Sequence, residues 1–373
     1  MLLVDRTRIE ADWTCPRKRY WLTEYQISQG NRTKRGIVPA NTPKPLAFGI
    51  VVHEGLEKLT SCHLTLEERK LGARPPLDHM ASLPEWKMLD QDQQWLAQAL
   101  VIGFGEEVWP QWVTQYEKVS IEQELEFEHE GVMYMCRPDI LLRERKTGDL
   151  WYPDFKTFGA GWSNRKWAYA LQQHLTILAC EKATGEKITG SWIQGLAKGT
   201  RRDSKMYHPL VYGWRKHGSP GLYTTAYAPK RRPGFERFPV VEYDVDQPTS
   251  GAEAIRGWIR MLRKRHPEIV SNLFPRTQPI FLKREMMDEF LTQRTKREKE
   301  IGNAVDMTPF PQTFSACEST YGTCPYLEAC WVPTVNRDPI KSGLYVQRTP
   351  HHEAERTVLR VNAGKYNFKV VAE

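Results

Sequence analysis

The sequence lacks the long apolar runs that mark membrane proteins. No stretch of its 373 residues is apolar over the length that a bilayer-spanning helix requires, and Met1–Arg6 lacks the sustained apolar segment of a secretion signal. Cysteine is scarce, and seven cysteines in a reducing compartment do not form a disulfide framework. We therefore expect a cytoplasmic protein without a membrane partner, whose cysteines bind a metal or lie buried.

The composition also lacks the signature of disorder, because 40% hydrophobic and 26% charged residues are typical of a globular protein with a sizeable core. The net charge of +8 favours polyanionic partners. A basic insert at 198–239 has ten Lys or Arg residues, interleaved with aromatic residues, against two acids. Such a surface can bind phosphates and stack on bases, although a solvated basic loop over a few packed aromatic residues explains it equally well. The candidate phosphate contacts are Arg201, Arg202, Lys230, Arg231 and Arg232.

Apolar periodicity predicts a mixed α/β core. Apolar residues alternate with glutamates from Ile121 to Glu128, which indicates a half-exposed strand, and turn signals follow at Glu130-Gly131 and at Lys146–Asp149. The expected order is strands at 121–128, 132–142 and 150–155, a helix at 164–184 and a strand at 188–196. Further helices are expected from Phe48, and at 90–116, 251–265 and 283–301.

The segments outside this core predict four parts. They are an N-terminal segment with a helical entry (1–47), the core with its basic insert (48–270), a helical and cysteine-containing region (271–335) and a tail (336–373). The helix at 283–301 is so highly charged that we expect it to be a solvated helix or a linker.

Two acidic motifs occupy the second and third strands of the core. Arg137-Pro138-Asp139 lies within the second strand, and Asp154-Phe155-Lys156 ends the third. Because side chains alternate along a strand, Asp154 and Lys156 share one face while Phe155 points into the core. Two carboxylates can hold Mg²⁺ against a phosphate, and a neighbouring lysine can orient water or stabilise developing charge. If either motif occurred alone, its aspartate would be more simply explained as a turn-flanking residue and its lysine as a surface residue. The occurrence of both motifs on successive strands favours a role in phosphodiester hydrolysis.

This arrangement resembles the PD-(D/E)xK nuclease superfamily, in its RecB-like branch. Pro138-Asp139 matches the first half of the family motif and Asp154-Phe155-Lys156 the second. The resemblance implies a restriction-endonuclease-like fold, in which helices flank a mixed central sheet. It also implies that Asp139, Asp154 and Lys156 are catalytic residues.

The resemblance extends to residues before and after these strands. The segment Gly49–Glu54 matches a Gly-x-x-x-His context, which implies that His53 binds the metal together with Asp139 and Asp154. Without the other motifs, His53 would be taken for a core or helix-capping histidine. An imidazole ligand favours Mn²⁺ alongside Mg²⁺.

A glutamine on the helix after the third strand is a further family feature. The resemblance assigns it to Gln172, with Gln173 as the alternative, and Thr176 stands where the family usually has tyrosine. Glu124, on the first strand, is a candidate acid near the metal or the DNA, and a solvated strand face explains it equally well.

The cysteines form a second pattern. Cys317, Cys324 and Cys330 are closely spaced, and because a tetrahedral site needs a fourth ligand, Cys15 is the candidate. The resemblance, to the CRISPR-adaptation and AddB types of RecB-like nuclease, implies that these four residues hold a [4Fe–4S] cluster. The spacing within the trio is wider than usual in the family, so Zn²⁺ is an alternative. The other cysteines, expected to be buried thiols, are Cys62, Cys136 and Cys180.

These inferences predict an Mg²⁺- or Mn²⁺-dependent deoxyribonuclease, an exonuclease or end-processing enzyme of replication, recombination or repair. A phage or mobile-element origin fits, and would place the protein in the host cytoplasm. The expected partners are DNA and either a helicase or recombination protein or further copies of the chain. The alternatives are a catalytically silent DNA-binding subunit and an iron–sulfur redox protein.

Overall fold

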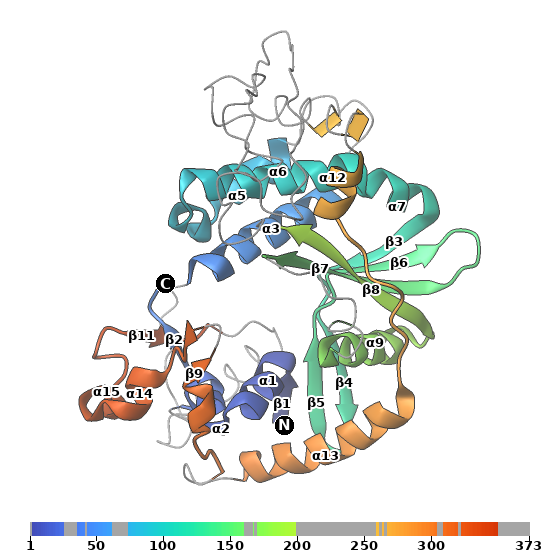
Figure 1. The fold of residues 1–373 in the computed structure, drawn as a ribbon. Coiled ribbons are helices and arrows are strands. Elements are labelled where there is room, and N and C mark those ends of the chain that lie inside the picture. The colour runs from blue at the N-terminus through green and yellow to red at the C-terminus, as the bar shows by residue number, and fades with distance from the viewer. Residues whose placement is uncertain are drawn as a thin grey trace, which may run out of the picture.

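A computed structural model describes most of the chain (Figure 1). The described residues are 2–25, 36–41, 43–61, 74–159, 167, 170–198, 259–260, 263–264, 267–303, 309–319 and 322–349. Among them, no helix combines the length and apolar character needed to cross a membrane.

The larger of the two main sheets carries the second acidic motif. Its strands, in order, are β3 (Tyr116–Ile121), β6 (Ile140–Glu144), β7 (Leu150–Phe158) and β8 (Ile188–Ala197). The pairs β3–β6 and β6–β7 are antiparallel, whereas β7 and β8 are parallel. A parallel pair requires a crossover connection, and α9 (Leu171–Thr184) lies in it. The mixed α/β core predicted from the sequence is confirmed.

α9 packs against one face of this sheet, and a group of helices covers the opposite face (Figure 1). They are α3 (Lys44–Ser61), α5 (Arg74–Ser82), the short 3-10 helix η2 (Pro84–Met88), α6 (Gln91–Glu107) and α7 (Trp109–Gln115). The start of α6 is set by a capping box between Asp90 and Gln93. Phe155 of β7 packs between Phe104 and Trp112, with ring centroids 5.2 and 5.9 Å away. This aromatic packing fixes the backbone of β7 against the helices.

A second sheet contains the first strand of the chain. Its order is β1 (Leu2–Asp5), β5 (Val132–Cys136) and β4 (Leu125–His129). β4 and β5 form a hairpin at Glu130 and Gly131, whose φ angles of 47° and 82° are those of a type I′ turn. β1 pairs in parallel with β5. The helical entry expected near the N-terminus is therefore preceded by a strand, which is too short to show a period in the sequence.

The chain crosses from the second sheet to the larger one at Arg137-Pro138-Asp139. The sequence predicts one strand over 132–142, but the structure divides it into β5 and β6, which belong to different sheets. Pro138 lacks an N–H and cannot continue a ladder, which accounts for the break. The predicted strand at 121–128 is divided too, because Glu122 has φ of 45° and separates β3 from β4. Both breaks lie where the two sheets meet.

The two ends of the described chain form a third packed region. Its N-terminal elements are α1 (Arg6–Thr14), α2 (Pro16–Arg19), the π-helix η1 (Tyr20–Glu24) and β2 (Ile37–Pro39). Its C-terminal elements are η4 (Phe314–Ala316), β9 (Glu318–Ser319), β10 (Gly322–Thr323), α14 (Leu327–Trp331), α15 (Pro333–Arg337) and β11 (Tyr345–Gln347). β11 pairs antiparallel with β2, and Trp21, Tyr326 and Tyr345 belong to the shared core. Two further helices, α12 (Pro267–Leu273) and α13 (Arg284–Gly302), lie between β8 and this C-terminal part in the sequence.

The highly charged helix α13 joins this third region to the second sheet (Figure 1). Arg19 donates to both carboxylate oxygens of Glu298 at 2.6 Å, and Arg294 donates to Asp12 at 2.7 Å. These four side chains are at most 5% exposed. The expectation of a solvated helix or linker is therefore wrong for this face, because its charges pair with residues of α1 and α2 that lie far away in the sequence.

Candidate active site

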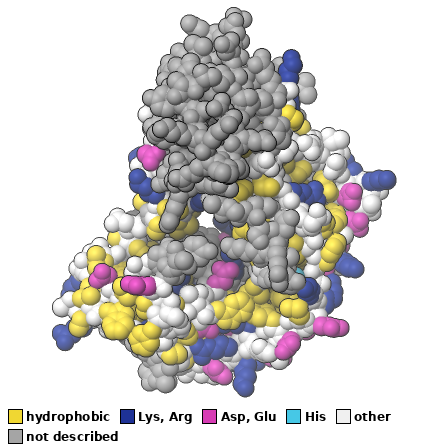
Figure 2. All heavy atoms as spheres, viewed as in Figure 1, with side chains coloured by type: hydrophobic (Ala, Val, Ile, Leu, Met, Phe, Trp, Pro, Cys, Tyr) yellow, Lys and Arg dark blue, Asp and Glu magenta, His cyan; other side chains and the backbone are white. Residues whose placement is uncertain are grey.

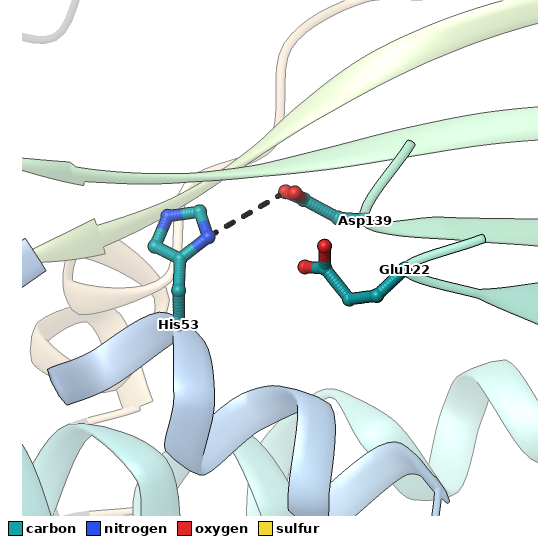
Figure 3. A group of neighbouring side chains, drawn as sticks. All are labelled: His53, Glu122 and Asp139. Carbon is teal, nitrogen blue, oxygen red and sulfur yellow. Dashed lines mark ion pairs between the residues drawn. The ribbon is translucent and has the colours of Figure 1, made fainter. Parts of the chain in front are cut away.

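His53 and Asp139 face each other where α3 meets the start of β6. His53 projects from α3 towards the junction of the two sheets, and its Nδ1 lies 3.8 Å from Oδ2 of Asp139 (Figure 3). The same Oδ2 accepts the backbone N–H of Phe155 at 2.6 Å. This bond fastens the first acidic motif to the strand that carries the second.

Glu122 lies beside Asp139 and completes a group of potential metal ligands. Its backbone N–H donates to the Asp139 carbonyl at 3.1 Å, and its carboxylate pairs with Arg137 at 2.8 Å. Ligand atoms of His53, Glu122 and Asp139 all lie within 4.8 Å of one another (Figure 3). We call this group the carboxylate pocket.

Electrostatics make the carboxylate pocket receptive to a cation. Burial, followed by the charge of Asp139, raises the pKa of Glu122 to about 9. Burial and the charge of Asp154 raise the pKa of Asp139, partly offset by His53 and Lys156. A divalent ion would relieve this repulsion, and two carboxylates with an imidazole form a donor set that suits Mg²⁺ or Mn²⁺.

Glu122 was not predicted as a site residue, because the alternation from Ile121 to Glu128 indicates an exposed glutamate at this position. A continuous strand with Ile121 and Leu125 inward would place an apolar side chain at 123, and the sequence has Gln123 there. That interruption was the available signal for a strand break. Glu124, the candidate acid predicted from the same stretch, does not line the cavity that His53, Glu122 and Asp139 line.

Asp154 and Lys156 lie on one face of β7, as the alternation predicts. Asp154 is fully buried, and its Oδ1 accepts hydrogen bonds from Tyr152 at 2.8 Å and from Gln172 at 2.9 Å. Its Oδ2 lies 2.5 Å from the Lys156 ammonium. Asp154 stands outside the group of three ligands, although it is near enough for its charge to act on Asp139.

The two glutamines at the start of α9 have different partners. Gln172 donates to Asp154, whereas Gln173 is fully buried and accepts from Ser191 at 2.8 Å. Thr176, in the position expected for tyrosine, is buried and bonds to Cys136. Of the two candidates, Gln172 is the one in contact with the acidic motif.

A cavity of about 390 Å³ opens beside this constellation. Its lining residues are Pro45, Leu46, Gly49, Ile50, His53, Glu54, Glu57, Glu122, Arg137, Asp139 and Thr157. A larger cavity of about 530 Å³ lies at the start of β8 and α13, and its lining contains neither histidine nor aspartate. The smaller cavity is therefore the better candidate for metal chemistry.

The ends of the chain bring candidate cysteines into one neighbourhood, which we call the cysteine region (Cys15, Cys317, Cys324 and Cys330). Cys15 accepts the Thr313 N–H at 3.3 Å, and Cys330 accepts the Trp21 indole N–H at 3.2 Å. Burial raises the pKa of Cys324 and of Cys330, and the charge of Cys15 acts on both.

These sulfurs do not form a compact ligand set. Within the described part of the chain, no three cysteine sulfurs come as close to one another as the ligands of the carboxylate pocket. A metal cluster here stays a prediction. Cys136 and Cys180 are buried free thiols, as expected, and Cys62 lies outside the described residues.

The candidate DNA contacts cannot be placed. The predicted phosphate contacts, Arg201, Arg202, Lys230, Arg231 and Arg232, all lie outside the described residues. On the face shown in Figure 2, the described Lys and Arg side chains are scattered among Asp and Glu side chains. The role of the basic insert stays a prediction.

The chain was compared with families of known proteins. The sequence model of the PD-(D/E)XK nuclease superfamily matches residues 6–331, a span that includes the carboxylate pocket, Asp154, Lys156 and Gln172. No curated protein matches the sequence significantly.

Proposed function

Because the chain belongs to the PD-(D/E)XK nuclease superfamily, we propose that it is an Mg²⁺- or Mn²⁺-dependent deoxyribonuclease of the RecB-like branch. We further propose that it acts on DNA ends, as an exonuclease or end-processing enzyme in replication, recombination or repair. The observation that carries the proposal is that His53 and Asp139 line one cavity, and that Asp139 is hydrogen-bonded to the strand on which Asp154 and Lys156 form an ion pair.

From the family resemblance we assign the metal to His53, Asp139 and Asp154, and we add Glu122 because it lies together with His53 and Asp139. When bound, a divalent ion would supply Lewis acidity to a phosphate oxygen and would lower the pKa of bound water. Asp139 is held for this task by the Phe155 N–H, and its backbone carbonyl holds Glu122 beside it. The ligands are thus positioned by backbone hydrogen bonds of the sheets.

Lys156 and Gln172 complete the proposed catalytic set. The Lys156 ammonium, 2.5 Å from Asp154, can orient an attacking water or stabilise charge developing on the phosphate. Gln172 and Tyr152 both donate to Oδ1 of Asp154, which leaves Oδ2 to face Lys156. Gln172 is therefore a positioning residue, acting through Asp154.

Digestion of end-labelled single- and double-stranded DNA with Mg²⁺ or Mn²⁺ tests the activity. Asp154→Asn and Lys156→Ala are expected to abolish digestion while DNA binding is largely retained. Asp149→Asn is the matched control, because Asp149 lies exposed in the turn between β6 and β7. Wild-type protein that cleaves neither substrate with either metal would refute the proposal.

Substrate topology tests the proposed action on ends. An exonuclease is expected to degrade linear DNA and to leave covalently closed circular DNA of the same sequence intact. Rapid linearisation of the circle would instead identify an endonuclease.

We also propose that the cysteine region holds a [4Fe–4S] cluster, with Zn²⁺ as the alternative. The observations in support are the approach of Cys15 to Cys324 and Cys330 and the joint packing of both chain ends. Iron and zinc analysis of protein purified without oxygen, with its absorption spectrum, distinguishes the two. A protein containing neither metal would refute both assignments.

The remaining assignments concern partners and location. We propose DNA as the substrate, a helicase or recombination protein or further copies of this chain as partners, and the cytoplasm as the location. Size-exclusion chromatography coupled to light scattering, with and without DNA, tests for self-association.

A further inference from the structure

Lys198 directly follows the last residue of β8. Its backbone N–H donates to the Phe158 carbonyl at 2.8 Å, which carries the β7–β8 ladder one step beyond Ala197. Its ammonium donates to the carbonyl of Pro45 at 3.3 Å and lies 5.8 Å from the ring centroid of Phe48. Because Pro45 lines the cavity, the ammonium of Lys198 contacts one residue of the cavity lining.

The charge of Lys198 is poorly compensated there. The side chain is half-buried, and loss of hydration lowers the pKa of Lys198. Within the described part of the chain, no carboxylate lies within ion-pair distance of its ammonium. Pro45 is in the first turn of α3, so Lys198 also lies at the positive end of that helix dipole, which disfavours a cation.

Lys118, at the opposite end of the same helix, provides a contrast. Its ammonium donates to the carbonyls of Thr60 at 3.1 Å and Ser61 at 3.4 Å, the last two residues of α3. A cation is favoured at this end of a helix, so Lys118 has a structural explanation. Lys198 also donates to a carbonyl of α3, but it does so at the end of the helix where a cation is disfavoured.

Two other cations at or near the cavity lie against carboxyl groups. Lys156 contacts Asp154, and Arg137 contacts Glu122. A phosphodiester that approaches a cavity lined by carboxylates must overcome their repulsion, and an unpaired cation beside the cavity would offset it.

We propose that Lys198 binds a backbone phosphate of the DNA strand beside the cavity and so positions the strand for cleavage. The inference rests on the proposed nuclease function and adds a substrate contact to that site. Removing the ammonium is expected to weaken binding of substrate and transition state alike, which raises KM and leaves kcat nearly unchanged.

The test compares Lys198→Met and Lys198→Arg with Lys118→Met in the full chain. DNA binding is measured over a salt series with Ca²⁺ in place of Mg²⁺, and KM and kcat are measured with Mg²⁺. For Lys198→Met we expect a roughly tenfold higher KM and a salt dependence, as log K against log salt, that is shallower by about one. Lys198→Arg and Lys118→Met should keep the wild-type slope.

Thermal melting is the control for a structural effect. Lys198→Met and Lys118→Met each lose hydrogen bonds to backbone carbonyls, so a small decrease in melting temperature is expected for both, whereas only Lys198→Met should change the salt slope and KM. A Lys198→Met protein with wild-type slope and KM, or a Lys118→Met protein with the same changes in slope and KM, would overturn this inference without affecting the proposed function. Wild-type protein that neither binds nor cleaves DNA would refute the proposed function and this inference with it.

Discussion

The carboxylate pocket and the cysteine region are both groups of candidate metal ligands, but they are held in place differently. In the pocket, hydrogen bonds of the sheet backbone fix Asp139 and Glu122, and the ligand atoms already lie within 4.8 Å of one another. In the cysteine region, Cys15 accepts the Thr313 N–H and Cys330 accepts the Trp21 indole N–H, and no described trio of sulfurs is equally close. The pocket is thus organised by the fold, whereas the cysteines would gain their final geometry from a metal.

The comparison predicts that a ligand of the pocket can be removed without unfolding the protein. Asp139→Asn is expected to lower kcat by about 10³-fold or more, about 4 kcal/mol in activation free energy, because it removes a metal-binding charge. The asparagine can still accept the Phe155 N–H, so the melting temperature should stay near that of wild type. Cleavage kinetics and thermal melting measure both effects, with Asp149→Asn as control. A clear loss of stability would show that Asp139 is structural.

The buried ion pairs between α13 and the N-terminal helices α1 and α2 should be the most sensitive point for the stability of the protein. Glu298→Ala leaves the buried charges of Arg19 and Arg294 without this partner, and we expect a loss of about 3–5 kcal/mol in the free energy of unfolding. Glu300, 53% exposed on the same helix, is the matched control, and Glu300→Ala should change stability by less than about 0.5 kcal/mol. Urea denaturation measures both. Equal effects would contradict a buried ion-pair network.

Removing a ligand of the cysteine region should affect stability before it affects chemistry. Cys330→Ser is expected to lose the bound metal and to lower Tm by about 3 °C, roughly 2 kcal/mol for a chain of this size. Folded Cys330→Ser should still cleave DNA at reduced temperature. Metal analysis, melting and cleavage assays check this, with Cys136→Ala as a control that should retain the metal. If Cys330→Ser lost cleavage activity but kept the wild-type Tm, the cysteine region would have a catalytic role and not a structural one.

The smallest expected effect concerns Glu122. Glu122→Gln should raise the metal concentration needed for half-maximal activity about tenfold, with little change in kcat at saturating metal, because one ligand of several is lost. The pKa of Glu122 is raised to about 9, so at neutral pH a metal must displace its proton, and metal affinity should increase with pH up to about 9. Metal titrations at several pH values check this. If Glu122→Gln keeps the same pH dependence as wild type, Glu122 is not a ligand.

Much of the core could be predicted from the sequence, because its signals are local. The alternation around Phe155 correctly places Asp154 and Lys156 on one face of β7, and the turn signal at Glu130-Gly131 coincides with the hairpin. The strand breaks beside Asp139 were missed, since an apolar run does not record a change of sheet.

Residues with distant partners could not be found this way. Glu122 faces Asp139 only because β3 and β6 pair, and the charged face of α13 is buried only because Arg19 and Asp12 lie against it. A charged residue is ordinarily exposed, so the sequence predicts a solvated helix in the absence of those contacts.

The sequence by itself determined the extended segments of the core, the two half-motifs and the alternation that aligns Asp154 with Lys156, because neighbouring residues in an extended chain have fixed relative orientations. Only the tertiary structure decided which groups meet. The break at Pro138 puts Asp139 at the junction of two sheets, α3 brings His53 to it, and the end of β8 brings Lys198 against Pro45 of the cavity lining. These encounters depend on how helices and sheets pack across long sequence separations, which no local pattern encodes.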